Sequence, residues 1–219
     1  MRQTVMPTVA VLTAALCWGW CYFFYIHGGT GPSLNAGPFE ESGRLMAQQA
    51  LQFLEPGGDV TVITRDTSTF KNPANDIQLA GFRQTLAKAH APIHLVRSLQ
   101  LDPLRPAVVP ASDFCELIQC TPPGSVIVSF LGPPLLTGAE RSRLAKDRPA
   151  IVAFCSGALP KADQLRALFD QGLLTAAVLD TRGASVAAPV AGNALAHPEQ
   201  PFLTLTPTNL AALQAAGQL

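Results

Sequence analysis

Short apolar segments alternate with amphipathic ones along the chain from about residue 40 onward. The apolar segments are rich in Val, Ile and Leu, which predicts β-strands, and in the others apolar residues recur at helical spacing. Pro-Gly and Gly-rich clusters separate the two kinds of segment. Strands are expected at 59–64, 93–99, 125–131, 150–155, 173–180 and 201–207, and helices at 42–54, 75–90, 112–120, 137–146, 161–171 and from 208 onward.

This alternation predicts the fold class. Six strands separated by helices, with short connections, indicate an open parallel α/β sheet of the Rossmann-like kind, with helices on both faces. The segments 125–131 and 150–155 are almost wholly apolar, which is typical of central strands covered on both sides. A chain of 219 residues is too short for an eight-stranded α/β barrel.

The beginning of the chain has a different pattern. Residues 5–26 contain no charged side chain. As a helix this stretch would measure roughly 33 Å, which is enough to cross about 30 Å of hydrocarbon. Its end carries Trp18, Trp20, Tyr22 and Tyr25, which resembles the aromatic belt at a membrane surface. We therefore expect one transmembrane helix here, through which the protein contacts the membrane.

Charge asymmetry predicts the orientation of this helix. Arg2 lies before it, and no Lys or Arg follows until Arg44, so the N-terminus is expected in the cytoplasm and the rest outside, in the periplasm of a bacterium. A cleaved signal peptide is the alternative, but its apolar core would be shorter and would end in small residues. The expected organisation is an anchor at 1–27, a flexible Gly/Pro linker at 28–39 and an extracytoplasmic domain at 40–219.

Composition excludes several functions. Lys and Arg total 15, as do Asp and Glu, so the chain lacks the basic excess typical of nucleic-acid binders. Histidine and cysteine nowhere have metal-ligand spacing, and no glycine-rich nucleotide loop follows a strand. No metal or cofactor is therefore predicted. Cys115 and Cys120 are five residues apart around a short helix, where two buried thiols are favoured over a disulfide.

Several motifs follow one another in an informative order. The run GRLMA at 43–47 precedes PGG at 56–58 and VTVI at 60–63, and QLAGFRQTL at 78–86 precedes Pro92. In this order the motifs resemble the second lobe of type I periplasmic binding proteins, the family of sugar-transport receptors and LacI-type repressors. The resemblance covers about 40–180 and implies one α/β lobe of that fold.

The departures from the family pattern concern ligand contacts. Only the expected anchor stands where the first lobe would be. Gln78 replaces an arginine that often contacts the ligand, LGPP at 131–134 replaces a polar strand tip, and Cys155 stands where the family often has a Gly-Phe-Asp end. A sugar site also needs Trp or Tyr to stack on the ring, and both types occur only before residue 26. The resemblance therefore implies a lobe that has lost most of the family's ligand chemistry.

Polar residues nevertheless follow three of the predicted strands, where open parallel sheets bind ligands. They could line a small polar cleft, or they could be the turn and cap residues that such loops need. The candidate ligand-binding residues are Asp66, Thr67, Asn72, Asn75, Asp76, Gln78, Ser156, Asp180 and Arg182.

Three functions are compatible with these observations. The first is a membrane-anchored extracytoplasmic interaction module that docks on a partner protein or on itself. The second is a tethered receptor or sensor for a small solute of unknown identity. The third is a hydrolase using Cys155 or Ser156, but no G-x-S-x-G elbow is present and His90, His94 and His197 have no informative spacing. A non-enzyme without catalytic residues is therefore expected.

One glycine lies inside a predicted helix. Gly81 stands within 75–90, where glycine is unfavourable relative to alanine and so indicates a packing reason. We expect Gly81 to let this helix lie close on the sheet, with Phe82 as its anchor in the core.

Overall fold

The computed structural model describes residues 34–69, 71–102, 108–156, 161–182 and 201–215, together with residues 17, 18 and 22. The expected transmembrane helix at 5–26 lies almost wholly outside these residues. None of the helices in the described ranges has the length and hydropathy that a membrane span needs. The chain divides into the units Met1–Asn35 and Ala36–Leu219, and the second unit holds every element discussed below.

Helices and strands alternate through this unit, as the sequence predicts. Helix α2 begins at Gly37, inside the expected linker, because Pro38 fits the first turn of a helix. Helix α5 ends after one turn instead of reaching residue 146. Leu144 is the only large apolar residue in 142–146, so a longer helix would have little apolar surface to bury. In order, the elements are α2 Gly37–Phe53, β1 Val60–Arg65, α3 Pro73–Lys88, β2 Ile93–Leu99, α4 Ala111–Cys120, β3 Val126–Ser129, α5 Gly138–Arg141, β4 Ala150–Cys155, α6 Ala162–Asp170, β5 Ala176–Asp180, β6 Phe202–Leu205 and α7 Pro207–Ala215.

The six strands form one sheet in the order β2-β1-β3-β4-β5-β6. The first five are parallel, which confirms the predicted α/β class. The expectation of a fully parallel sheet is wrong for β6, which pairs antiparallel with β5. Asp180 lies opposite Phe202, so the chain leaves β5 and enters β6 at the same edge of the sheet. A parallel pair would require the chain to cross back to the other edge first.

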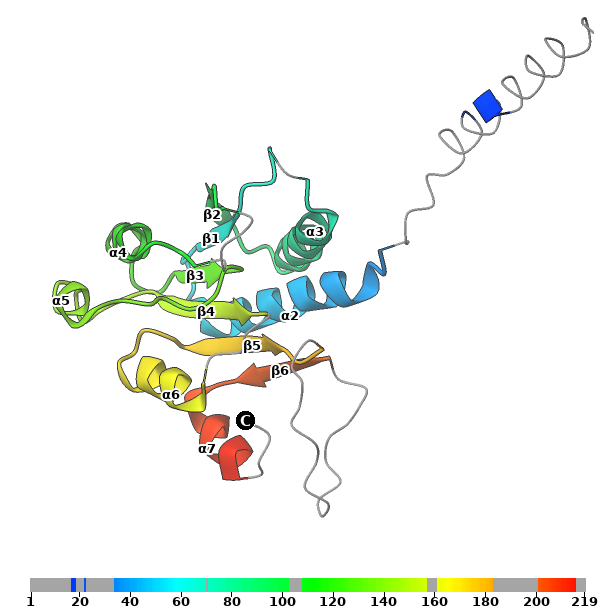
Figure 1. The fold of residues 1–219 in the computed structure, drawn as a ribbon. Helices are drawn as coiled ribbons and strands as arrows, with labels where there is room; N and C mark the ends of the chain where they lie inside the picture. The colour runs from blue at the N-terminus through cyan, green and yellow to red at the C-terminus, as the bar shows by residue number, and fades with distance from the viewer. Residues whose placement is uncertain are drawn as a thin grey trace, which may run out of the picture. The chain divides into compact units, whose positions relative to one another are not determined.

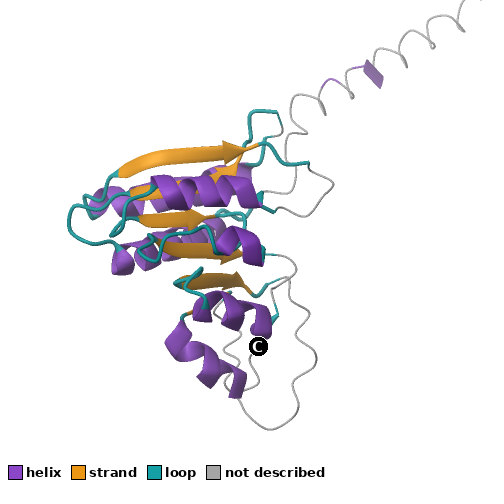
Figure 2. Ribbon diagram, turned by 90° about the vertical axis from the view of Figure 1, so that its left-hand side faces the viewer, coloured by secondary structure: helices purple, strands orange, loops and turns teal. Residues whose placement is uncertain are grey.

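Helices cover both faces of the sheet (Figures 1 and 2). Because successive side chains of a strand point to opposite faces, each strand contributes to two apolar clusters. Val62, Val128 and Val152 pack with α2 and α3 on one face. Ile63 and Ile127 belong to the cluster on the other face, where α4, α6 and α7 lie. The two clusters together form the core that the sequence pattern predicts.

Two glycines bring α2 and α3 into close contact. A Cβ atom on Gly43 would lie 2.0 Å from the carbonyl oxygen of Gln78, and one on Gly81 would lie 2.7 Å from that of Glu40. The expectation that Gly81 lets α3 approach the sheet is therefore wrong, because its close neighbour is α2. The sheet contact belongs to Phe82, which is fully buried and packs edge-on against Phe130 at 5.3 Å between ring centroids.

The cysteine pair on α4 is not bridged. Cys115 and Cys120 are both free, which agrees with the preference for thiols over a disulfide. The expected burial of both thiols is wrong, because Cys120 is exposed and Cys115 is half-buried. Positions five apart on a helix point in different directions, so one of the two can face the core while the other faces solvent.

Candidate functional site

The parallel strands end at the edge of the sheet where α2 begins (Figure 1). We call this the carboxyl edge. It contains the loop between β1 and α3, the residue after β4, and the residues that follow β5. Most of the candidate residues predicted from the sequence lie there, as the topology of an open parallel sheet requires.

The candidates between β1 and α3 have hydrogen-bond partners within residues 66–76. Asp66 accepts a hydrogen bond at 2.8 Å from the backbone N–H of Ser68, and this bond lowers the pKa of the Asp66 carboxyl. Thr67 donates its hydroxyl to Asp76 across 3.4 Å. Asn72 caps α3, since its side-chain oxygen accepts from the N–H of Asn75 at 3.4 Å. These contacts are those of turn and cap residues.

Gln78 lies inside the contact between the two helices on one face. Its side chain is buried, and Nε2 donates at 2.8 Å to the hydroxyl of Ser42. Ser42 in turn donates at 2.8 Å to the carbonyl oxygen of Phe39. These two hydrogen bonds give the buried amide of Gln78 a partner and link α3 to the first turns of α2. Gln78 therefore makes a contact inside the protein and does not line a surface site.

Asp180 and Arg182 form a second polar group at the carboxyl edge. The Arg182 guanidinium binds the Asp180 carboxylate through two hydrogen bonds, of 2.9 Å from Nε and 2.7 Å from an Nη. Its central carbon lies 5.2 Å from the ring centroid of Phe39 on α2 and 5.0 Å from that of Phe202 on β6. Arg182 therefore joins β5, β6 and the start of α2 by ionic and cation–π contacts.

Burial and the neighbouring Arg182 shift the pKa of Asp180 in opposite directions. Removal from water raises the pKa, whereas the hydrogen bonds and positive charge of Arg182 lower it, and the net shift is downward. Asp180 is consequently ionised at neutral pH and paired. Sequence reasoning named both members of the pair but missed the two rings, because nothing in the local pattern brings Phe39 and Phe202 to the same place.

The two nucleophile candidates after β4 differ in exposure. Cys155 is 3% exposed, and burial raises the pKa of its thiol to about 12, so the reactive thiolate is absent at neutral pH. Ser156 is exposed. Neither has a described histidine beside it, because His90 and His94 lie at the opposite edge of the sheet, with His94 at 3.6 Å from Asp59 before β1. His197 lies outside the described residues.

We expect Cys155 to resist alkylation in the folded protein. At pH 8, iodoacetamide should modify the exposed Cys120 readily and Cys155 at least tenfold more slowly, because the Cys155 thiol is buried and neutral. Quantification of the alkylated peptides by mass spectrometry tests this, with urea-unfolded protein as the control in which both react. Equal rates in the folded protein would contradict the placement of Cys155.

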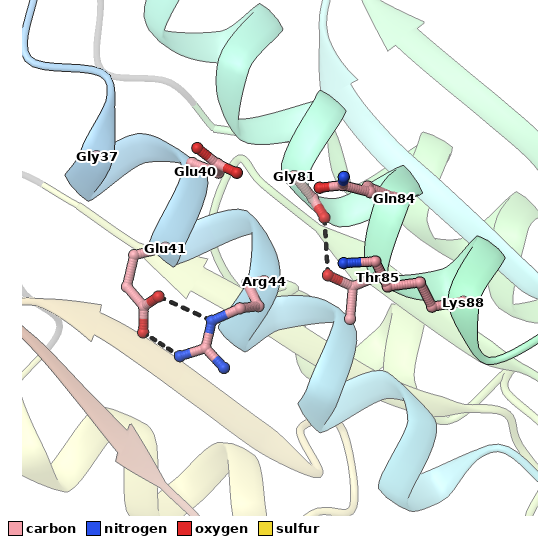
Figure 3. A pocket seen from close by; sticks show the side chains of 8 residues that line it. All are labelled: Gly37, Glu40, Glu41, Arg44, Gly81, Gln84, Thr85 and Lys88. Carbon is pink, nitrogen blue, oxygen red and sulfur yellow. Dashed lines mark hydrogen bonds and ion pairs between the residues drawn. The ribbon is translucent and has the colours of Figure 1, made fainter.

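Two shallow hollows lie on the surface, and neither is lined by any of the candidate residues. One, of about 240 Å³, lies between the outer surfaces of α2 and α3 and is drawn in Figure 3. Three of its polar side chains have partners: Arg44 is ion-paired with Glu41, and Thr85 donates to the carbonyl oxygen of Gly81 at 2.9 Å. The other, of about 300 Å³, lies where the parallel strands begin, beside Ser125 and Thr175. Within the described ranges, no group of three or more His, Cys, Asp or Glu could hold a metal ion.

Solved structures with the same architecture match the chain. They include a protein from Mycobacterium smegmatis (TM-score 0.51, 18% identity) and a periplasmic ribose ABC transporter from Conexibacter woesei (TM-score 0.50, 15% identity). A third is described as a LacI transcriptional regulator from Bacteroides fragilis (TM-score 0.50, 14% identity). The domain has the fold of a type I periplasmic-binding-protein lobe. The resemblance found in the sequence motifs is thereby confirmed at the level of fold.

The matches cover only part of these neighbours. Between 80% and 82% of this chain aligns, against 60% to 61% of each matched structure, so the chain spans about three fifths of their length. No family model matches the sequence, and no curated protein matches it. At identities of 14% to 18%, the similarity to periplasmic binding proteins concerns the fold of the lobe. The ligands of the matched proteins are properties of those proteins.

Proposed function

We propose that this chain is a membrane-anchored extracytoplasmic interaction module, in which one periplasmic-binding-protein-like lobe docks on a protein partner. The observation that carries the proposal is the state of the carboxyl edge. Its polar side chains have partners close by in the chain: Asp66 accepts from the backbone N–H of Ser68, Asn72 accepts from the backbone N–H of Asn75, and Asp180 accepts from the guanidinium of Arg182. A receptor for a polar solute needs such groups to converge on an open space instead.

The aromatic side chains support the same proposal. Sugar receptors hold the sugar ring between aromatic faces. Residues 27–219 contain neither Trp nor Tyr, so phenylalanine is the only large aromatic residue available there. At the carboxyl edge, the rings of Phe39 and Phe202 are already in contact with the guanidinium of Arg182. In a two-lobed receptor this edge would face the second lobe. A single lobe presents it to solvent, where a protein surface is a suitable cover.

The anchoring part of the proposal rests on residues 5–26, with their uncharged run and aromatic end. The full chain should stay with the membrane fraction after alkaline carbonate extraction. A variant that begins at residue 34 should be released by the same treatment. Release of the full chain would contradict the anchor and leave the proposal for the carboxyl edge standing.

A photo-crosslinking experiment tests the docking edge in the full chain. A benzoylphenylalanine placed at Ser156, which is exposed on the carboxyl edge, should give a discrete protein adduct in cells. The same probe at Gln119, which is exposed at the end of α4 on the opposite edge, is the matched control. Equal adducts at both positions, or none at Ser156, would contradict the proposal.

The tethered-receptor alternative has its own readout. Titration calorimetry of the protein with a panel of pentoses and hexoses should show no saturable heat at micromolar affinity. A saturable heat would favour the receptor. A heat that disappears in Arg182→Ala would place the sugar at the carboxyl edge, because Arg182 touches both rings there.

A further inference from the structure

The hollow beside Ser125 and Thr175 lies where three neighbouring strands of the sheet begin. Ser125 directly precedes β3, Ala150 is the first residue of β4, and Thr175 directly precedes β5. These strands are adjacent in the sheet, in the order β3-β4-β5 (Figure 1). We call this the strand-start hollow. Its volume of about 300 Å³ is at the lower end of the range typical of small-molecule pockets, so a ligand there would be small.

Charged side chains of both signs line the strand-start hollow. Lys146 and Arg148 come from the segment before β4, and Glu55 follows α2. Within the described part of the chain, the Lys146 ammonium has no hydrogen-bond or ion-pair partner. Arg148 donates from one Nη to the carbonyl oxygen of Gln171 at 2.9 Å, and this bond uses only one of the five N–H donors of a guanidinium. Two positive groups and one negative group give the lining a net charge of +1.

Two glycines leave room for the charged groups. Gly172 precedes β5 and Gly124 precedes β3, and both have positive φ angles, of 62° and 82°. A Cβ atom on Gly172 would lie 3.3 Å from an Nη of Arg148, and one on Gly124 would lie 2.9 Å from Oε2 of Glu55. The basic group therefore lies over the turn before β5 and the acidic group over the turn before β3. Because β4 lies between these strands, the two charges stay apart and form no ion pair with each other.

Two hydroxyl groups add neutral donors to this lining. The Ser125 hydroxyl oxygen accepts from the backbone N–H of Asp59, and the Thr175 hydroxyl oxygen accepts from that of Ile151, both at 3.1 Å. Each hydroxyl retains its own proton as a donor. Ser125 is 1% exposed, so its position is fixed by the surrounding structure. The hollow therefore offers two cationic and two neutral donor groups to a ligand.

We propose that the strand-start hollow binds a small organic monocarboxylate. The carboxylate would accept hydrogen bonds from Lys146 and Arg148, whose positive charges strengthen such bonds. The apolar part of the ligand would pack against Phe53 and Pro149, which also line the hollow. One negative charge matches the net charge of the lining. Glu55 repels a second negative charge, so a dianion is expected to bind less well.

The hollow is shallow, so the expected binding is weak. We expect a Kd on the order of 1 mM at low salt, and the Kd should increase with ionic strength because exposed charges are screened. The site lies where the parallel strands begin, whereas the proposed docking surface lies at the carboxyl edge. The two proposals therefore fail separately, since loss of carboxylate binding would leave the Ser156 adduct unchanged.

A titration followed by NMR tests the site in the full chain. The ¹⁵N-labelled protein in detergent is titrated with benzoate, and the backbone amide resonances of Ser125 and Thr175 should shift to saturation. Lys146→Gln should raise the Kd for benzoate at least fivefold, because it removes one of the two cations. Lys71→Gln is the matched control and should leave the Kd within about twofold. Both lysines are exposed and have no partner among the described residues, so both variants should fold.

Benzamide, which keeps the ring and lacks the charge, should give no saturable shift in the same titration. Three results would overturn the proposal. They are no saturable shift with benzoate up to about twenty times the expected Kd, the same shifts with benzamide as with benzoate, and equal effects of the two lysine variants.

The role of Glu55 has its own test. Glu55→Gln keeps the size of the side chain and removes its charge, so it should favour phthalate, which adds a second carboxylate to the benzoate ring. The ratio of the Kd for phthalate to the Kd for benzoate should fall at least threefold. Circular dichroism verifies that the variant is folded. An unchanged ratio, or tighter binding of inorganic phosphate than of benzoate to the unmodified protein, would overturn the assignment of a monocarboxylate.

Discussion

Replacing Gly43 by alanine is expected to destabilise the domain by about 3 kcal/mol. The new Cβ would lie 2.0 Å from the carbonyl oxygen of Gln78 and 2.9 Å from the backbone nitrogen of Phe82. Both atoms belong to the backbone of α3, so no side chain can turn aside and the two helices must separate. That separation would also disturb the buried hydrogen bond between Gln78 and Ser42. Urea unfolding, followed by circular dichroism, measures the loss.

Gly81→Ala should destabilise in the same way but less, because its Cβ would lie 2.7 Å from the carbonyl oxygen of Glu40. Gly138→Ala is the control for both. It lies in the first turn of α5, and its Cβ would meet nothing closer than the flexible end of Arg141, at 3.6 Å. We expect that variant to be neutral or slightly stabilising. If Gly43→Ala were as stable as Gly138→Ala, the close contact between α2 and α3 would be wrong.

Phe82→Ala is expected to cost about 3–5 kcal/mol, through lost apolar burial and the cavity left behind. Phe82 is fully buried and packs against Phe130 of the segment that follows β3, with the rings at 87° to each other. Such a loss is a large share of the roughly 5–15 kcal/mol that stabilises a domain.

Leu135→Ala is the control for this substitution, because Leu135 is 56% exposed and should change the free energy of unfolding by less than about 0.5 kcal/mol. Thermal unfolding of both variants gives the comparison. A Phe82→Ala midpoint close to that of the unmodified protein would contradict the burial of this ring and, with it, the position of α3 on the sheet.

The candidate site shows how far sequence reasoning reaches. Asp66, Asn72 and Asp180 could be placed at the carboxyl edge because they follow strands, and the periodicity of the strands is readable from the residues. Whether they form a cleft or a set of turns could not be decided in that way. The answer depends on hydrogen bonds to particular neighbours, and the structure gives each of the three a partner within three residues along the chain.

Arg182 illustrates a contact that local patterns cannot predict. Phe39 and Phe202 lie far from each other along the chain, and each has an ordinary sequence environment. They meet at Arg182 because α2 begins at the carboxyl edge and β6 turns back beside β5. The direction of β6 therefore determines whether the cation–π contacts exist.

The amino-acid sequence alone predicts the α/β alternation, the buried inner strands and the likeness to one periplasmic-binding-protein lobe. These follow from the spacing of apolar side chains and from short motifs, which act over a few residues. Three features became visible only in the folded chain: β6 runs antiparallel, Gly81 faces α2, and Gln78 is buried against Ser42. Each of these depends on which elements pack together, and packing joins residues whose separation along the chain leaves no periodic signal.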